Sequence, residues 1–188
     1  WTACNSTTPS HASILTGLAV GDHGVMDNRS MLGPENETLA ERLRAAGWET
    51  AAAVSVEHLQ AGKSGLGQGF DRFLLAETDS SLDGAITIDA VLAWLDEWRT
   101  AGDRPFFLWV HLFDPHTPYG PPKEFLDLYR QRSRRAVPSR YARPPTVPTT
   151  AWHRPGEFLD GVTNREYAAF LYGAGVSSAD ELVSRMWA

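Results

Sequence analysis

The sequence predicts an α/β fold with a mainly parallel sheet, and three observations carry this prediction. Segments with helical spacing alternate with short apolar segments along the chain. The run from Phe106 to Phe113 is continuously apolar and lies between Pro105 and Asp114-Pro115, which is typical of a strand buried on both faces. The connections between segments are short, as expected for right-handed crossovers between parallel strands.

The first helix is expected at residues 9–16. Pro9 suits the first helical position, Thr8 suits the N-cap, and Gly17 suits the left-handed residue that ends a helix. Thr7 would then lie just outside the helix N-terminus, where unpaired N–H groups and the helix dipole favour an anion. A hydroxyl held there faces an oxyanion site, although Ser or Thr before a proline-started helix is also ordinary capping.

A helix over residues 37–46 and a strand over residues 49–56 are expected next. Asn36 suits the N-cap of this helix, and Gly47 suits its end. Because helix and strand follow each other closely, we expect them to form part of one crossover unit.

A long helix is expected before the Phe106 run. Ser80 with Asp83 resembles a capping box at its start, and the helix reaches about Thr100. Its apolar stripe consists of Ile88, Val91, Leu92 and Leu95. This stripe faces the core in an amphipathic helix.

Composition limits the class of protein. Of the 188 residues, 43% are hydrophobic and 21% are charged, as in soluble globular domains. No apolar run approaches the roughly 20 residues that cross a membrane. The single cysteine excludes a disulfide within the chain.

The segment 130–155 departs from the α/β pattern. It holds five of the twelve prolines, and its first fourteen residues contain six arginines and no acidic residue. Such a basic segment could touch nucleic acid. However, it has no apolar periodicity, so we expect a Pro/Arg-rich surface insertion without regular structure, and no nucleic-acid partner.

Residues 7–18 resemble the nucleophile segment of the sulfatase family, within the alkaline phosphatase superfamily. They read Thr-Thr-Pro-Ser-His-Ala-Ser-Ile-Leu-Thr-Gly-Leu and are followed by His23-Gly24-Val25 and Asn28. The family carries Cys or Ser, any residue, Pro, any residue and Arg, and a few positions later Leu-Thr-Gly. By this match Thr7 stands at the nucleophile position and His11 stands at the arginine position.

The threonine indicates a particular branch of the family. Sulfatases convert their Cys or Ser to formylglycine; a Thr cannot supply this aldehyde, and Cys4 lies three residues too early. The resemblance is therefore to the branch with an unmodified Thr, in which Thr7 would attack the ester directly and bind a divalent metal ion (Ca, Mn or Zn). It assigns His11 to orienting Thr7 or to stabilising charge.

A second motif follows the Phe106 run. The sequence His-Leu-Phe-Asp-Pro-His-Thr-Pro-Tyr over residues 111–119 resembles the Pro-His-x-Pro loop of sulfatases, and it leaves the carboxyl end of a predicted strand, where α/β sheets bind ligands. The resemblance assigns His116 to binding the ester oxygens or assisting the leaving group. His111 is expected to be a packed core histidine, and Lys63 a solvated turn residue. The segment 165–183 resembles the family's helix after this loop.

The resemblance implies a partial alkaline-phosphatase-like three-layer sandwich over residues 1–188, lacking both ends of the family's domain. Thr7 is the single residue that it assigns to the metal, so most metal ligands would lie outside this chain. We expect a metal-dependent hydrolase of small-molecule or glycan sulfate or phosphate esters, inactive as this fragment alone. Two alternatives remain: a phosphoethanolamine- or phosphoglycerol-type transferase, and a non-catalytic sulfatase-like binding module.

Overall fold

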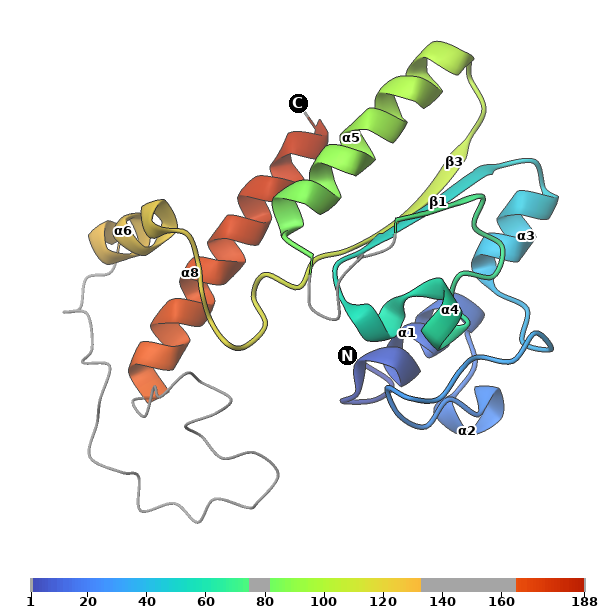
Figure 1. Cartoon of the computed structure of the whole chain (residues 1–188), viewed down its shortest axis with the longest axis horizontal. Coiled ribbons are helices and arrows are strands. Elements are labelled where there is room, and N and C mark those ends of the chain that lie inside the picture. The colour runs from blue at the N-terminus through green and yellow to red at the C-terminus, as the bar shows by residue number, and fades with distance from the viewer. Residues whose placement is uncertain (1, 75–81, 133–164, 188) are drawn as a thin grey trace. The chain divides into compact units, whose positions relative to one another are not determined.

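The computed structural model describes residues 2–74, 82–132 and 165–187, in two units, Trp1–Phe113 and Asp114–Ala188 (Figure 1). The elements of the first unit are α1 (Thr7–Thr16), α2 (Val20–His23), α3 (Leu39–Ala45), β1 (Glu49–Val54), the 3₁₀ turn η1 (Glu57–Leu59), α4 (Ala61–Ser64), β2 (Arg72–Leu74), α5 (Gly84–Ala101) and β3 (Phe106–His111). Those of the second unit are α6 (Lys123–Arg132), α8 (Arg165–Ser184) and the 3₁₀ turn η2 (Arg185–Trp187).

The first unit is built on a parallel sheet with the strand order β2-β1-β3. Ala52 of the central strand pairs with Phe73 on one side and Trp109 on the other. Residues 51–54 of β1 are fully buried, because the strand has a neighbour on each edge and a helix layer on each face. The α/β fold with a parallel sheet is thus confirmed.

Residues of β3 show which helix covers which face of the sheet. Trp109 packs against the core cluster that includes Leu15 of α1. Phe106 stacks on Trp98 of α5, with ring centroids 4.8 Å apart. Because residues an odd number apart in a strand point to opposite faces, α1 and α5 cover opposite faces and the unit has three layers.

The helix α3 begins at a different cap from the one expected. Thr38, not Asn36, is the N-cap: its hydroxyl accepts the Glu41 N–H at 3.2 Å, and the Glu41 carboxylate accepts the Thr38 N–H at 2.8 Å. This is a capping box. Asn36 is buried instead and donates to the carbonyl of His23 at 3.5 Å, so a contact distant in sequence outweighs its local capping preference.

The later elements follow the predictions with shifted ends. β1 ends at Val54, two residues early. Asp83, expected at the third helical position of a capping box begun by Ser80, is itself the N-cap of α5 and accepts the Ala85 N–H at 2.7 Å, so this expectation is wrong; Ser80 lies outside the described residues. The expected full burial of the Phe106 run is wrong: Phe106 is 44% exposed, because in the described sheet β3 is an edge strand.

The second unit is a helical pair. α6 and α8 pack through Tyr129 and Phe170, whose ring centroids lie 5.3 Å apart. The helix expected at 165–183 is confirmed. Most of the expected insertion at 130–155 lies outside the described residues, but residues 130–132 are helical, so the absence of regular structure is wrong there. None of the described helices is long and apolar enough to span a membrane.

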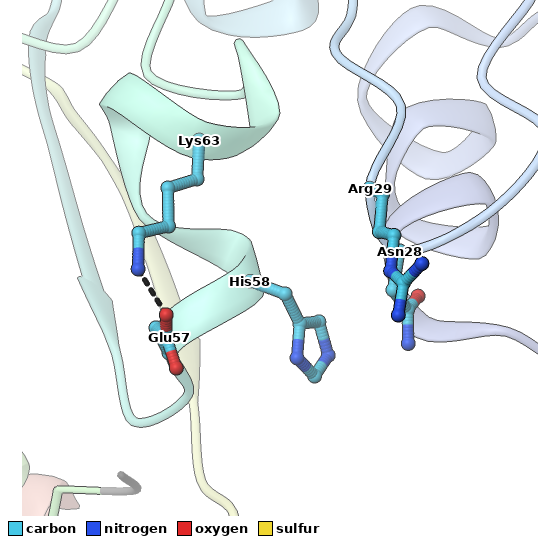
Figure 2. Close-up of a pocket in the computed structure, with 5 residues that line it drawn as sticks. All are labelled: Asn28, Arg29, Glu57, His58 and Lys63. Atoms are coloured by element: carbon cyan, nitrogen blue, oxygen red, sulfur yellow. Dashed lines mark hydrogen bonds and ion pairs between the residues drawn. The ribbon is translucent and has the colours of Figure 1, made fainter. Parts of the chain in front are cut away.

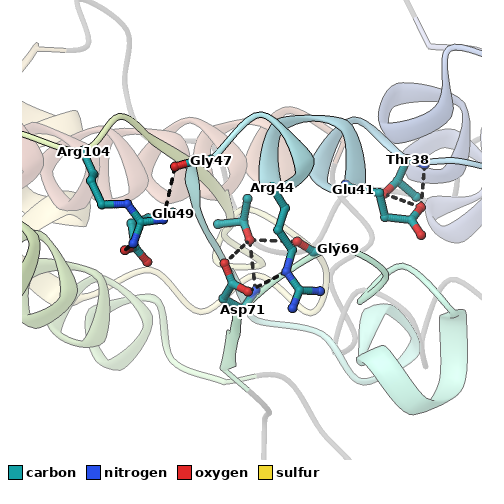
Figure 3. Close-up of polar contacts among 9 residues, drawn as sticks. Thr38, Glu41, Arg44, Gly47, Glu49, Gly69, Asp71 and Arg104 are labelled. Carbon is teal, nitrogen blue, oxygen red and sulfur yellow. Dashed lines mark hydrogen bonds and ion pairs between the residues drawn. The ribbon is translucent and has the colours of Figure 1, made fainter.

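A polar junction joins the end of α3 to β1 and β2 (Figure 3). Thr50 Oγ1 donates to the Gly69 carbonyl at 2.7 Å and accepts the Asp71 N–H at 3.0 Å. Asp71 also pairs with Arg44 at 2.8 Å. Gly69 has a φ of +83°, and a β-carbon there would lie 2.2 Å from the Glu41 nitrogen. Only glycine fits this approach of backbone to backbone.

Gly69→Ala is therefore expected to destabilise the protein more than Gly47→Ala. Gly47 has a similar φ of +87° but open space around its β-position. The control should cost about 1–2 kcal/mol for the left-handed backbone alone, and the clash should add about 1–3 kcal/mol at Gly69. Urea unfolding of the two variants measures the difference, and equal losses would contradict the close approach.

Candidate active site

Thr7 is the first residue of α1 and not, as expected, a residue outside the helix. Ser6 is the N-cap: its backbone is extended, and its carbonyl accepts the Ser10 N–H at 3.2 Å. Gly17 ends the helix with a φ of +72°, as predicted. Thr7 is half-buried. Because it is the first residue of the helix, it lies at the positive end of the helix dipole.

Two contacts of Thr8 hold the first turn of α1 in place. The Thr8 N–H, which has no partner within the helix, donates to Asn28 Oδ1 at 2.8 Å. The Thr8 hydroxyl donates to the carbonyl of His58 at 3.3 Å. Thr8, the predicted N-cap, thus uses its hydroxyl to bind the segment of His58. The Thr8 N–H is capped by the side chain of Asn28, twenty positions away. Helix-capping preferences cannot detect such a partner, because they consider only neighbours in sequence.

His11 lies beside the backbone of Thr7. Its Nδ1 is 2.8 Å from the Thr7 carbonyl oxygen, which can only accept, so Nδ1 carries the hydrogen. The ring centroid lies 5.6 Å from that of Trp109 and 5.1 Å from that of His111. Burial lowers the pKa of His11, and the hydrogen bond to Thr7 opposes this effect in part.

Two of the predicted site residues, Thr7 and His11, therefore lie together. The contact is made by the backbone carbonyl of Thr7 and not by its hydroxyl. His111, expected to be a packed core histidine, is half-buried and contacts His11 edge to face. The neutral form of His11 that burial favours carries its lone pair on Nε2.

A pocket of about 440 Å³ adjoins these contacts. Asn28, Arg29, Glu57, His58 and Lys63 line it. Figure 2 shows Asn28 and Arg29 on one side, Glu57 and Lys63 on the other, and His58 between them. Since Asn28 and His58 both bind Thr8, the residue after Thr7, the pocket is fastened to the start of α1.

Sequence reasoning missed most of this pocket. Glu57, His58 and Lys63 follow the carboxyl end of β1, the position at which α/β sheets bind ligands. The sequence places polar side chains directly after the β1 strand, just as it does after the Phe106 strand, so the pocket could have been expected from the same rule. Lys63, expected to be a solvated turn residue, lies in the last turn of α4 and forms an ion pair with Glu57.

Ser13 and His23 form a hydroxyl–imidazole pair with a structural role. Ser13 Oγ lies 2.9 Å from His23 Nε2, and His23 Nδ1 accepts the Val25 N–H at 3.1 Å. Because Nδ1 is the acceptor, Nε2 carries the hydrogen in the neutral ring and donates to Ser13. His23 therefore cannot act as a base toward Ser13, and the pair links α1 to α2.

His116 belongs to the second unit. Its side chain is exposed, and Nδ1 lies 2.7 Å from the carbonyl oxygen of Thr117, so Nδ1 donates. Nε2 is then the atom of His116 suited to accept a proton or to bind a ligand when the ring is neutral.

The described residues do not by themselves form a metal centre. Among them, no group of three or more His, Cys, Asp and Glu side chains is arranged to hold a metal ion. Divalent cations need several carboxylate or imidazole ligands. Thr7 alone does not meet this requirement.

The fold is shared with hydrolases of known structure. The phosphonate monoester hydrolase of Agrobacterium radiobacter superposes with a TM-score of 0.68 at 16% identity, over 99% of this chain and 50% of its own. BT4656, solved with its substrate D-glucosamine-2-N,6-O-disulfate, gives 0.54 at 18% identity, over 98% and 45%. A protein of the alkaline phosphatase superfamily from Vibrio parahaemolyticus gives 0.50 at 13% identity, over 96% and 40%.

These superpositions define an alkaline-phosphatase-like α/β fold. The chain spans about half the length of the structures that it matches. The sulfatase family profile matches residues 1–187. The chain belongs to the sulfatase family, as the two sequence motifs indicated. No curated protein shows significant sequence similarity to it.

The burial of His11 leads to a prediction on pH. Its pKa lies below the usual 6.5, chiefly through burial. The folded chain then binds this proton less readily than the unfolded chain, so His11 lowers the stability of the fold as the pH falls through 6.5. A titration of histidine ring resonances by NMR, with His11→Asn to assign the signal, should give a midpoint below 6.5. A midpoint at or above that value would contradict the burial of the ring.

Proposed function

We propose that this chain carries the nucleophile of a hydrolase acting on sulfate or phosphate esters, with Thr7 as that nucleophile. The observation that supports it best is the position of Thr7. Thr7 is the first residue of helix α1, and this helix begins beside a pocket lined by Arg29 and Lys63. Helix N–H groups and cationic side chains are the surroundings that an oxyanion ester requires.

The proposed reaction has two steps. Thr7 Oγ loses its proton and bonds to the phosphorus or sulfur atom, while the bond to the leaving alcohol oxygen breaks and that oxygen takes up a proton. Water then cleaves the Thr7 ester, which restores the hydroxyl and releases the acid. A threonine hydroxyl is a weak nucleophile and needs activation by a base or a metal.

His11 is proposed as a positioning residue. Its hydrogen bond to the Thr7 carbonyl orients the first turn of α1. Its lowered pKa disfavours an imidazolium, so of the two roles considered for it, orientation of Thr7 is better supported than charge stabilisation. His116 is proposed to bind the ester oxygens or to protonate the leaving group through Nε2.

The divalent cation implied by the family resemblance is part of the proposal, with Thr7 as its one assigned ligand. In the described part of the chain the donor set is otherwise incomplete. The cation would lower the pKa of the bound hydroxyl. We expect its other ligands outside this chain.

Among esters, we expect phosphodiesters and phosphonate monoesters to react faster than sulfates, because an unmodified threonine replaces formylglycine. The known substrate class of the phosphonate monoester hydrolase that shares the fold agrees with this expectation. The transferase alternative differs in its acceptor, an alcohol in place of water. Product analysis by phosphorus NMR distinguishes hydrolysis from transfer.

Thr7→Ala is expected to lower kcat/KM of the full-length protein about 1000-fold or more, because the covalent step is lost. Thr7→Ser should keep measurable activity. Ser13→Ala is the matched control, since it removes a hydroxyl from the same helix and should cost only stability, about 1 kcal/mol. Hydrolysis of nitrophenyl phosphate, phosphodiester and sulfate checks all three variants. Full hydrolysis by Thr7→Ala would overturn Thr7 as the nucleophile, whereas absence of hydrolysis by the wild type would favour the non-catalytic binding module.

His116→Asn separates the two roles proposed for this histidine. If His116 protonates the leaving group, the loss in kcat/KM should be larger for alkyl esters than for nitrophenyl esters, by about 10²-fold or more. If it binds the ester oxygens, the loss should be the same for both. Steady-state rates on the two ester series provide the measurement.

A further inference from the structure

The pocket beside Thr8 contains three formally charged side chains that do not act alike. Glu57 and Lys63 form an ion pair across one wall (Figure 2). Arg29 stands on the opposite wall and is in none of the salt bridges of the described residues, although its charge acts on the carboxylate of Asp27, which does not line the pocket. With the imidazole counted as neutral, the formal charge of the lining is a single positive unit.

The loop that carries the ion pair is well ordered by its own contacts. Ser64, fully buried beside Lys63, donates its hydroxyl to the carbonyls of Leu59 and Gln60 at 3.1 and 2.9 Å and accepts the Leu66 N–H at 3.1 Å. These bonds close the chain from η1 to α4. The five residues between Glu57 and Lys63 therefore form a closed loop, and the ion pair is a feature of this loop and not of two unrelated surface side chains.

The charge of the lining has a consequence for substrate choice. A phosphodiester, a phosphonate monoester and a sulfate ester carry one negative charge, whereas a phosphate monoester carries two near neutral pH. A pocket with one net positive charge neutralises a singly charged ester. A second negative charge on the ligand would be repelled by the Glu57 carboxylate, and the Lys63 ammonium group that could attract it is already paired with Glu57.

We propose that Glu57, by pairing with Lys63, lowers the affinity of this pocket for doubly charged esters relative to singly charged ones. The inference rests on the proposed function in placing the ester in this pocket. It adds a specificity-determining residue that does not take part in bond making. Glu57 is one-third exposed and Lys63 about one-half, so the effect is screened and modest in size.

The test compares two ligands that differ by one charge. Phenylphosphonate is a dianion at pH 8.5, and its monomethyl ester is a monoanion of similar shape. Calorimetric titration at low salt of the full-length protein in the Thr7→Ala background, which lacks the proposed nucleophile, gives both dissociation constants without turnover of the ester. Glu57→Gln should improve binding of the dianion relative to the monoanion by about three- to fivefold.

Two further variants control for charge and for folding. Glu37→Gln removes the same charge from a surface pair with Arg42 outside the pocket, and its ratio should equal that of the wild type. The double variant Glu57→Gln with Lys63→Met returns the lining to one positive charge, so its ratio should return to the wild-type value.

An unchanged ratio in Glu57→Gln, or an equal change in Glu37→Gln, would overturn the proposal. A double variant that keeps the altered ratio would also overturn it. These outcomes are independent of the fate of the proposed function, which fails if Thr7→Ala retains full hydrolysis. The ratio of kcat/KM values for nitrophenyl phosphate and methyl nitrophenyl phosphate should shift in the same direction as the binding ratio.

Discussion

The first turn of α1 needs partners for its free N–H groups, and this requirement organises the candidate site. Thr8 meets it through Asn28, and its hydroxyl reaches His58. One residue thereby fastens the nucleophile helix to two loops that line the pocket. Together with the core cluster that contains Leu15 and Leu59, these contacts hold Thr7 near the cationic side chains, which come from segments as many as fifty-six positions apart.

The central strand supports this arrangement from below. Its buried alanines leave room for helices on both faces, so α1 can lie against Trp109 and His111 of β3. The same packing surrounds the His11 ring and lowers its pKa. In the proposed site the positive charge that no carboxylate of the lining pairs with is that of Arg29, and His11 is proposed to position Thr7. The family motif differs at this position, because it carries a charged arginine where this chain has a histidine whose pKa burial lowers.

Periodicity and turn chemistry predicted α1, α3, β1, α5 and β3, but not the short strand β2 or the helices α2, α4 and α6. The apolar stripe of α5, the run of β3 and the glycine after α1 each depend on neighbours in sequence, and all were predicted. The N-caps of α1, α3 and α5 were not predicted, since Ser6, Thr38 and Asp83 occupy these positions and not Thr8, Asn36 and Ser80. The expected burial of β3 was wrong for a related reason: an apolar run indicates a strand but not how many neighbours it has in the sheet.

By itself the sequence determined the family, the α/β class and the candidates Thr7, His11 and His116, because motifs and hydrophobic spacing are local properties of the chain. Only the tertiary structure decided that the His11 ring packs against Trp109 and His111 and that Glu57 pairs with Lys63 across the pocket from Arg29. These facts depend on distances between atoms that folding brings together, and on burial, which changes the pKa of a side chain without any change in its neighbours in sequence.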